Sequence, residues 1–260
     1  MTVRRGIILA AGLGSRLADG SGVPKPLVKV GGRPMIRHVL SAFRGAGLTE
    51  AVVVVGFQGD RIRRALAGED GIRVEVVENR EWEKSNGVSV LAAAKSVDQP
   101  CILSMSDHLY GPGMVRGLCR IPASDASCQL VVDGDVAGVF DIDDATKVRR
   151  EGDRIVAIGK ELADYDGIDC GVFRVTPALI GALSDAYAER GDCSLSDGVR
   201  KLCAGDRMRA VGVTGEPWID VDTPQALRAA TALLGSGKWE GVREAPARER
   251  ARVGVVLPPA

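Results

Sequence analysis

The sequence predicts an α/β protein of the Rossmann-like, doubly wound type with a mixed sheet. Short apolar runs alternate with amphipathic stretches through the first half of the chain, and two of these runs are almost wholly apolar, which is typical of strands buried on both faces of a parallel sheet. The second half changes to a pattern that indicates a hairpin. The length of 260 residues suits one large α/β domain, or at most two small ones.

Strands and helices are expected to alternate in the first half. The strands are predicted over residues 6–10, 51–55, 101–105 and 129–132. The helices are predicted over residues 34–45, 60–66, 88–96 and 112–118. Pro34 and Pro112 stand where the first turn of a helix tolerates proline. This order implies a sheet that binds ligands at the carboxyl ends of its strands.

The second half is predicted to begin with a hairpin over residues 146–158. Further strands are expected at 168–175 and 218–222, and helices at 177–187, 196–204 and 224–234. Ser194 or Ser196 is a candidate cap for the helix at 196–204. Residues 1–235 are therefore predicted to form a single domain. Residues 236–260, which include a stretch rich in Arg and Glu, are predicted to form a C-terminal tail.

The composition excludes several classes of protein. With 34 basic and 34 acidic side chains the net charge is zero, which argues against a broad nucleic-acid-binding face. No apolar run approaches the ~20 residues that span a bilayer, and the short apolar start is read as a first strand rather than a signal peptide. Six scattered cysteines fit reduced thiols and a cytoplasmic protein.

The strongest motif is a glycine-containing loop that follows the first predicted strand. Residues 9–16 read Leu-Ala-Ala-Gly-Leu-Gly-Ser-Arg, and a Pro-Lys-Pro-Leu sequence follows at 24–27. Gly12 and Gly14 let the backbone approach a polyphosphate closely. Arg16 and Lys25 add cations that can neutralise it.

Two better-known phosphate-binding motifs do not fit this loop. A P-loop ends in Gly-Lys-Ser/Thr, whereas this loop has Gly-Ser-Arg. A dinucleotide fingerprint has a third glycine, and Leu17 stands at that position. The alternative is an ordinary turn between a strand and a helix, with surface cations.

Acidic residues follow two other predicted strands. Asp107 follows the apolar run at 101–105, and Asp220 and Asp222 lie at the end of the 218–222 strand. Carboxylates at the carboxyl ends of strands are well placed to hold Mg²⁺ together with substrate phosphate oxygens. The alternative is that Asp107 and Asp222 cap the helices that follow them.

Several other polar residues are candidates for substrate contacts. Asn86 and Ser89 stand at the start of a predicted helix and suit the edge of a base or ribose, or else turn and capping roles. His108 is a candidate partner for a substrate hydroxyl, or else a hydrogen-bonded structural histidine. Lys160 could bind the phosphate of a second substrate, and Asp169 could accept hydrogen bonds from sugar-like hydroxyls.

The loop motif with Pro-Lys-Pro-Leu resembles the signature of sugar-phosphate nucleotidyltransferases, and the resemblance extends to about residue 234. More narrowly, several segments resemble the CTP:inositol-1-phosphate cytidylyltransferases. These segments are Ser-Asn-Gly-Val-Ser at 85–89, Ser-Asp-His at 106–108, and the sequences at 143–148, 156–162, 168–171 and 218–223.

The resemblance implies a nucleotidyltransferase (GT-A-like) fold and Mg²⁺-dependent transfer of CMP from CTP to inositol 1-phosphate, giving CDP-inositol and pyrophosphate. It implies that Arg16 and Lys25 bind the triphosphate and act in catalysis, and that Asp107 with Asp220 or Asp222 holds Mg²⁺. The nucleotide contacts that it implies are Leu9, Ala10, Ala11, Gly12, Gly14, Ser15, Asn86 and Ser89. The acceptor contacts are His108, Lys160 and Asp169.

Other substrates stay open at this point. They include another sugar 1-phosphate, a cyclitol phosphate such as valienol 1-phosphate with GTP, and phosphocholine or a phosphonate with CTP. From a different class, the chain could be a nucleotide-binding regulatory module. Ser106 departs from the resembling family, which usually has Gly there. That family is often fused to a membrane-embedded alcohol phosphotransferase, and no such segment occurs in this sequence.

Overall fold

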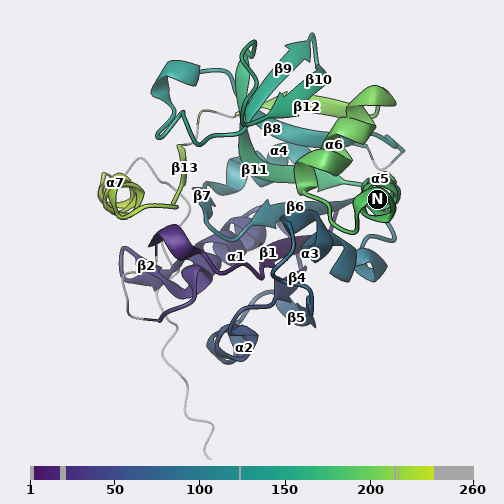
Figure 1. Ribbon diagram of the computed structural model, residues 1–260. Coiled ribbons are helices and arrows are strands. Elements are labelled where there is room, and N and C mark those ends of the chain that lie inside the picture. The colour runs from purple at the N-terminus through teal and green to yellow at the C-terminus, as the bar shows by residue number, and fades with distance from the viewer. Residues whose placement is uncertain (1–2, 18–21, 123, 214, 216, 237–260) are drawn as a thin grey trace, which may run out of the picture.

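The computed structural model describes residues 3–17, 22–122, 124–213, 215 and 217–236. A nine-stranded mixed sheet forms its centre, in the order β5-β4-β1-β6-β11-β8-β12-β10-β9 (Figure 1). One end of the sheet is parallel and consists of β5 (Arg73–Glu78), β4 (Glu50–Val55), β1 (Arg5–Ala10) and β6 (Cys101–Met105). The predicted mixed α/β fold is confirmed.

The other end of the sheet has mixed pairing. Its strands are β11 (Gly167–Val175), β8 (Cys128–Asp133), β12 (Met208–Gly212), β10 (Arg154–Gly159) and β9 (Lys147–Glu151). β11 runs antiparallel to both β6 and β8, and the β9–β10 hairpin is the predicted one. β9 also pairs with the start of β11. This end of the sheet therefore curls back on itself and encloses space beside β11.

Helices cover both faces of the sheet. One face carries α1 (Met35–Gly45), α2 (Gly59–Leu66) and α4 (Pro112–Cys119), and the other carries α3 (Asn86–Ala92), α5 (Pro177–Arg190) and α6 (Leu195–Ala204). Successive strand side chains point to opposite faces, so Ile8 packs in one core and Ile7 in the other. Both cores are continuous across the two ends of the sheet.

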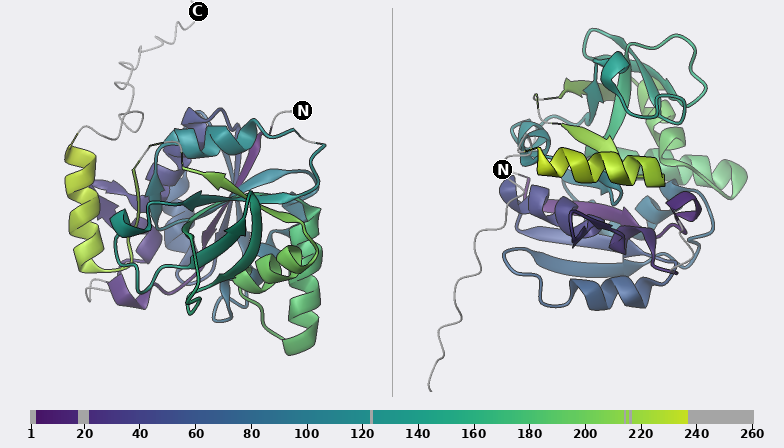
Figure 2. Two further views of the ribbon diagram at one scale, coloured as in Figure 1. Left: turned by 90° about the horizontal axis from the view of Figure 1, so that it is seen from above. Right: turned by 90° about the vertical axis from the view of Figure 1, so that its left-hand side faces the viewer.

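A smaller layer brings the end of the described chain to the glycine loop. The short strand β13 (Trp218–Asp220) pairs with β7 (His108–Tyr110), so that Asp220 lies opposite His108. Helix α7 (Pro224–Gly235) then packs over β2 (Lys29–Val30), which pairs with β3 (Arg33–Pro34). Figure 2 shows α7 lying along the side of the molecule, between its two ends.

Several predicted boundaries and caps need correction. The predicted helix at 88–96 is α3 followed by a separate 3-10 turn at Ala94–Ser96. The strand expected to reach Asp222 ends at Asp220. The alternative cap roles of Asp107 and Asp222 are wrong, because the N-cap residues of α4 and α7 are Gly111 and Thr223. The short strands at 29–30 and 33–34 and the strands β5, β7 and β12 were not predicted from the sequence.

Ser194 caps α6, as one of the two predicted alternatives. Its side chain accepts a hydrogen bond from the backbone N–H of Asp197, and the Asp197 carboxylate accepts one from the backbone N–H of Ser194, which forms a capping box.

A single domain over residues 1–235 stays a prediction. The predicted tail at 236–260 lies, beyond its first residue, outside the described residues. No helix in the described part of the chain has both the length and the apolar character to cross a membrane.

Candidate functional site

Two adjoining cavities lie at the carboxyl ends of β1 and β6. The loop cavity, with a volume of about 1140 Å³ that includes open solvent at its mouth, is lined by the glycine loop, Lys25 and the start of α3. The hairpin cavity, with a volume of about 840 Å³ that likewise includes open solvent, lies beside β11 and the end of β10. They share the side chains of Asn86, Met105, His108, Lys160, Asp220 and Asp222. A ligand in one cavity can therefore contact a ligand in the other.

The glycine loop forms one wall of the loop cavity. β1 ends at Ala10, and the chain then turns through Gly14, which has a φ of +63°. A Cβ atom at Gly14 would lie 2.4 Å from Lys25 Cβ. Only glycine combines this backbone conformation with such a close approach, so Gly14 allows the Lys25 side chain to reach the cavity. Leu9, Ala10, Ala11 and Gly12 line the same wall.

The cations of this wall form ion pairs with the predicted metal-binding acids. Lys25, which is nearly buried, donates to Asp107 Oδ2 at 2.5 Å and also bonds Asp222. Arg16 is half-exposed and bonds Asp222 too. Cations and carboxylates therefore alternate across the floor of the site. The Ser15 side chain, a predicted nucleotide contact, lies outside what the structure describes.

His108 bridges two of these acids and is held by its neighbours. Its Nδ1 lies 3.0 Å from Asp107 Oδ1 and 3.7 Å from Asp220 Oδ1. The ring stacks on Trp218, with centroids 6.1 Å apart. A Cβ atom at Gly171, where φ is +70°, would lie 2.4 Å from the His108 ring. Burial opposes protonation, but Asp220 and Asp107 outweigh it and raise the pKa of His108 to about 9.

The acid cluster fits a divalent cation. Asp107, His108 and Asp220 each offer a ligand atom, and these atoms lie within 4.8 Å of one another. Asp220 Oδ1 is buried and accepts no hydrogen bond from any described residue. Burial opposes ionisation of Asp107, but Lys25 and His108 hold the pKa of its carboxyl well below the usual range. An ionised carboxylate beside an unsatisfied buried oxygen is a donor set that suits Mg²⁺, whereas the imidazole of His108 suits other metals better.

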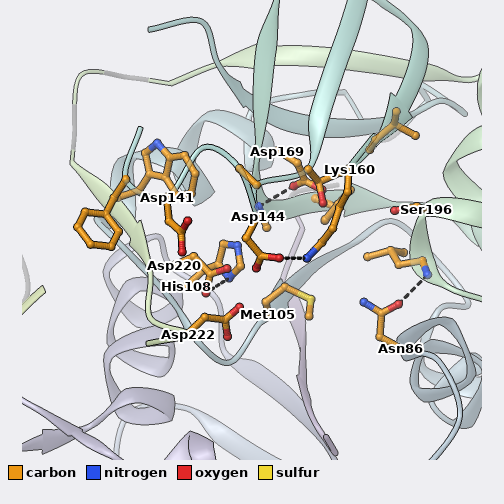
Figure 3. A pocket seen from close by; sticks show the side chains of 18 of the residues that line it. Asn86, Met105, His108, Asp141, Asp144, Lys160, Asp169, Ser196, Asp220 and Asp222 are labelled. Carbon is orange, nitrogen blue, oxygen red and sulfur yellow. Dashed lines mark hydrogen bonds and ion pairs between the residues drawn. The ribbon is translucent and has the colours of Figure 1, made fainter. Parts of the chain in front are cut away.

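The hairpin cavity combines a lysine with several carboxylates (Figure 3). Lys160 follows β10, is half-exposed, and donates to Asp144 Oδ1 at 2.6 Å. Asp169 lies on β11 and accepts a hydrogen bond from the Gly171 backbone at 2.7 Å. Burial is the largest influence on Asp169 and raises its pKa to about 6, against the effects of Gly171 and His108.

Asn86 and Ser89, the predicted contacts to base or ribose, both line the loop cavity. The Asn86 side-chain oxygen accepts a hydrogen bond from the Leu195 backbone at 2.8 Å. Ser89 is buried, and its hydroxyl oxygen accepts from Asn79 at 3.0 Å. The predicted site residues that the structure describes thus come together in the two cavities. Their individual roles stay predictions.

Sequence reasoning missed several residues of the site, three of them polar or aromatic side chains that line the cavities together with the predicted cations. Asp144 joins Arg16 to Lys160 across the junction of the cavities, and Trp82 and Lys84 line the loop cavity. Asp144 lies in the 143–148 segment that carries part of the family resemblance, so that segment was the available signal. Trp82 and Lys84 stand just before the 85–89 segment, and nothing in their local pattern distinguishes them from an ordinary loop.

The chain is similar to known nucleotidyltransferases. The family described as "MobA-like NTP transferase domain" matches residues 6–140. The "Bifunctional IPC transferase and DIPP synthase" of Rubrobacter xylanophilus is 38% identical over 240 residues, which are 90% of this chain and 53% of that protein. The "2-aminoethylphosphonate cytidylyltransferase" of Lancefieldella rimae is 34% identical over 197 residues, 71% of this chain and 74% of that protein. The chain spans about half the length of the bifunctional relatives that it matches.

Solved structures share the fold. The inositol-1-phosphate CTP transferase from T. maritima superposes with a TM-score of 0.80 at 24% identity, over 91% of this chain and 98% of that one. A UDP-glucose pyrophosphorylase complexed with UDP-glucose has a TM-score of 0.75 at 14% identity, over 90% of this chain and 98% of that one. At these identities the likeness establishes the nucleotidyltransferase fold.

Proposed function

The chain belongs to the family of MobA-like NTP transferase domains, and we propose that it is a Mg²⁺-dependent cytidylyltransferase that transfers CMP from CTP to inositol 1-phosphate. The observation that carries this proposal is the arrangement of Arg16, Lys25 and Lys160, each paired with an aspartate, along two cavities that share part of their lining. Each of the two substrates would occupy its own cavity. The 38% identity to a protein named as an IPC transferase favours this nucleotide and acceptor.

The loop cavity binds CTP in this proposal. Arg16 and Lys25 contact the triphosphate, and the open space at Gly12 admits it close to the backbone. Binding CTP takes both cations away from the carboxylates that they contact in this structure. Asp107 and Asp220 would then hold Mg²⁺, which supplies positive charge next to the triphosphate.

The hairpin cavity binds the acceptor. Lys160 contacts the phosphate of inositol 1-phosphate. Asp169 and His108 form hydrogen bonds with the ring hydroxyls. An oxygen of the acceptor phosphate attacks the α-phosphorus of CTP in line, and the bond to the β-phosphate bridging oxygen breaks. CDP-inositol forms and pyrophosphate leaves. The attacking oxygen is already ionised near pH 7, so the chain supplies position and charge rather than a general base.

A phosphonate acceptor is the second candidate. Asp141, Asp144 and Asp169 line the hairpin cavity, and this concentration of acids would suit an ammonium group as well as neutral hydroxyls. The relative from Lancefieldella rimae is named for an aminophosphonate. A primary amine on the acceptor therefore defines a distinct alternative.

Pyrophosphate release tests the two candidates together. The purified chain is mixed with Mg²⁺ and each of the four nucleoside triphosphates, against inositol 1-phosphate, 2-aminoethylphosphonate and glucose 1-phosphate. The proposal predicts turnover with CTP and inositol 1-phosphate above every other pair. Preference for 2-aminoethylphosphonate would favour the second candidate. Tight CTP binding without turnover of any pair would contradict both and favour a regulatory nucleotide-binding role.

A further inference from the structure

The side-chain amide of Asn86 has a fixed orientation in the loop cavity. The backbone N–H of Leu195 donates to Asn86 Oδ1 at 2.8 Å. Leu195 is the first residue of α6, so its N–H has no acceptor within its own helix. Only the oxygen of an amide accepts a hydrogen bond, and only the nitrogen donates. The nitrogen Nδ2 is therefore turned away from Leu195 and toward the cavity (Figure 3).

Contacts on either side keep Asn86 in this place. Its neighbour Ser85 bonds Asp192 through its backbone N–H at 3.0 Å and its hydroxyl at 2.8 Å. Gly87 packs so closely on the loop before α6 that a Cβ atom there would lie 2.5 Å from the Cys193 carbonyl oxygen. Turning the amide over would bring an N–H against the Leu195 N–H. Among the described residues none accepts a hydrogen bond from Nδ2, so Asn86 offers the cavity donors alone.

The charges of the loop cavity decide which end of a nucleotide lies near Asn86. Arg16 and Lys25, together with the acids that they contact, form the end that attracts the triphosphate. Figure 3 shows Met105 between Asp222 of that group and Asn86. Trp82 also lines the loop cavity, and its flat ring offers a base a surface to pack on. The base of a bound nucleotide therefore lies on the Asn86 side.

We infer that Asn86 selects cytosine over uracil by donating a hydrogen bond from Nδ2 to N3 of the base. The inference rests on the proposed function, because it concerns the nucleotide of that reaction. Cytosine has a lone pair at N3, whereas uracil has a proton there. A uracil in the same position would place N–H against N–H and leave both donors without a partner, which is the kind of mismatch that gives strong discrimination.

The most direct test is Asn86→Asp, which keeps the size of the side chain. One carboxylate oxygen still accepts from Leu195, but the other now faces the base and accepts from uracil N3–H. Equilibrium titration with CTP and with UTP, in Mg²⁺ and without acceptor, gives the ratio of the two dissociation constants. We expect the preference for CTP to fall by at least about tenfold. An unchanged ratio in a variant with a normal melting transition would overturn the inference.

A matched variant controls for the added negative charge. Ser196→Asp places a carboxylate on the wall of the neighbouring hairpin cavity. This variant is expected to weaken the binding of CTP and of UTP by similar factors. The ratio of the two dissociation constants should then equal that of the unmodified chain. A similar loss of CTP preference in Ser196→Asp would assign the effect to charge and contradict a hydrogen bond from Asn86.

A second measurement uses the unmodified chain and does not depend on the folding of any variant. 3-Deazacytidine triphosphate has C–H in place of N3 and lacks the lone pair, while zebularine triphosphate keeps N3 and lacks the 4-amino group. We expect the 3-deaza compound to bind at least about tenfold more weakly than CTP, and the zebularine compound to keep most of the affinity. Equal binding of the 3-deaza compound and CTP would contradict the inference. These titrations need no acceptor, so a wrong acceptor in the proposed function would leave their outcome unaffected.

Discussion

Asp144 and Lys160 form an ion pair at 2.6 Å, and the other oxygen of Asp144 lies 2.5 Å from Arg16. The carboxylate therefore links the cation proposed for the nucleotide to the cation proposed for the acceptor. Arg16 lies on the glycine loop and Lys160 follows the hairpin, so the link crosses the junction of the two cavities. Two negatively charged substrates bound as proposed would compete with Asp144 for both partners.

Replacing Asp144 with Asn should therefore favour acceptor binding. The change removes the charge that competes for Lys160, and exposed pairs of this kind are weak. We expect the KM for inositol 1-phosphate to fall by about two- to fivefold with little change in kcat. Asp143→Asn removes the same charge from the neighbouring residue and serves as the control. A large increase in KM in Asp144→Asn would instead mean that Asp144 contacts the acceptor.

Replacing Lys160 with Met should impair acceptor binding selectively. The change removes the one cation that the account assigns to the acceptor phosphate, so the KM for inositol 1-phosphate should rise by about tenfold or more, while the KM for CTP stays within about twofold. Lys201→Met, which removes a lysine paired with Glu189 on the surface of α6, is the control. An equal rise in the KM values for inositol 1-phosphate and CTP would contradict the assignment of Lys160 to the acceptor site.

Replacing Asp107 with Asn should impair catalysis without unfolding the chain. This carboxylate binds Mg²⁺ in the proposed function, so kcat should fall by about a thousandfold and the Mg²⁺ concentration needed for half-maximal activity should rise. Asp98→Asn, which changes a largely exposed carboxylate paired with Arg5, is the control. Near-normal activity at low Mg²⁺ would exclude Asp107 as a ligand.

Replacing Gly171 with Ala should disturb both stability and the position of His108. The residue has a φ of +70°, and the new methyl group would collide with the His108 ring. We expect a loss of about 1–3 kcal/mol in the free energy of unfolding and a lower kcat. Gly181→Ala is the control, because this helical glycine has nothing within 4 Å of the new atom. That variant should gain up to about 1 kcal/mol. Equal stability of the two variants would refute the packing argument.

The lowered pKa of His38 should make the free energy of unfolding depend on pH. Burial is the largest influence and lowers its pKa below the unfolded value, against a hydrogen bond to Val30. Below pH about 6.5 the unfolded chain therefore binds a proton that the folded chain does not. The stability difference between the unmodified chain and His38→Gln should be largest above that pH and shrink as the pH falls toward 5. Urea unfolding of both chains at pH 7.5 and 5.5 measures it, and a difference that grows on acidification would contradict the argument.

The strands that are buried on both faces of the sheet could be predicted well from the sequence. The apolar runs that became β1, β4 and β6 could be identified because both of their faces pack in cores. β5 was missed because it lies at the edge of the sheet and mixes Arg and Glu with Val. β7 was missed because its three residues form a strand only by pairing with β13, more than a hundred residues later.

The site was predictable where a local motif carries it. Arg16, Lys25 and Asp107 belong to such motifs, and the structure brings them together. The contact between Asp144 and Arg16 could not be predicted, because it joins residues 128 positions apart. The charge of His108 could not be predicted either, since it depends on Asp220, which tertiary pairing of β7 with β13 places opposite it.

Isotope transfer tests the central claim most directly. Inositol 1-phosphate labelled with ¹⁸O in its non-bridging phosphate oxygens is incubated with the chain, Mg²⁺ and CTP, and both products are analysed by mass spectrometry. Attack by the acceptor phosphate on the α-phosphorus predicts CDP-inositol that retains all of the label, together with unlabelled pyrophosphate. Label in the pyrophosphate, or the absence of CDP-inositol while CTP is consumed, would contradict the account.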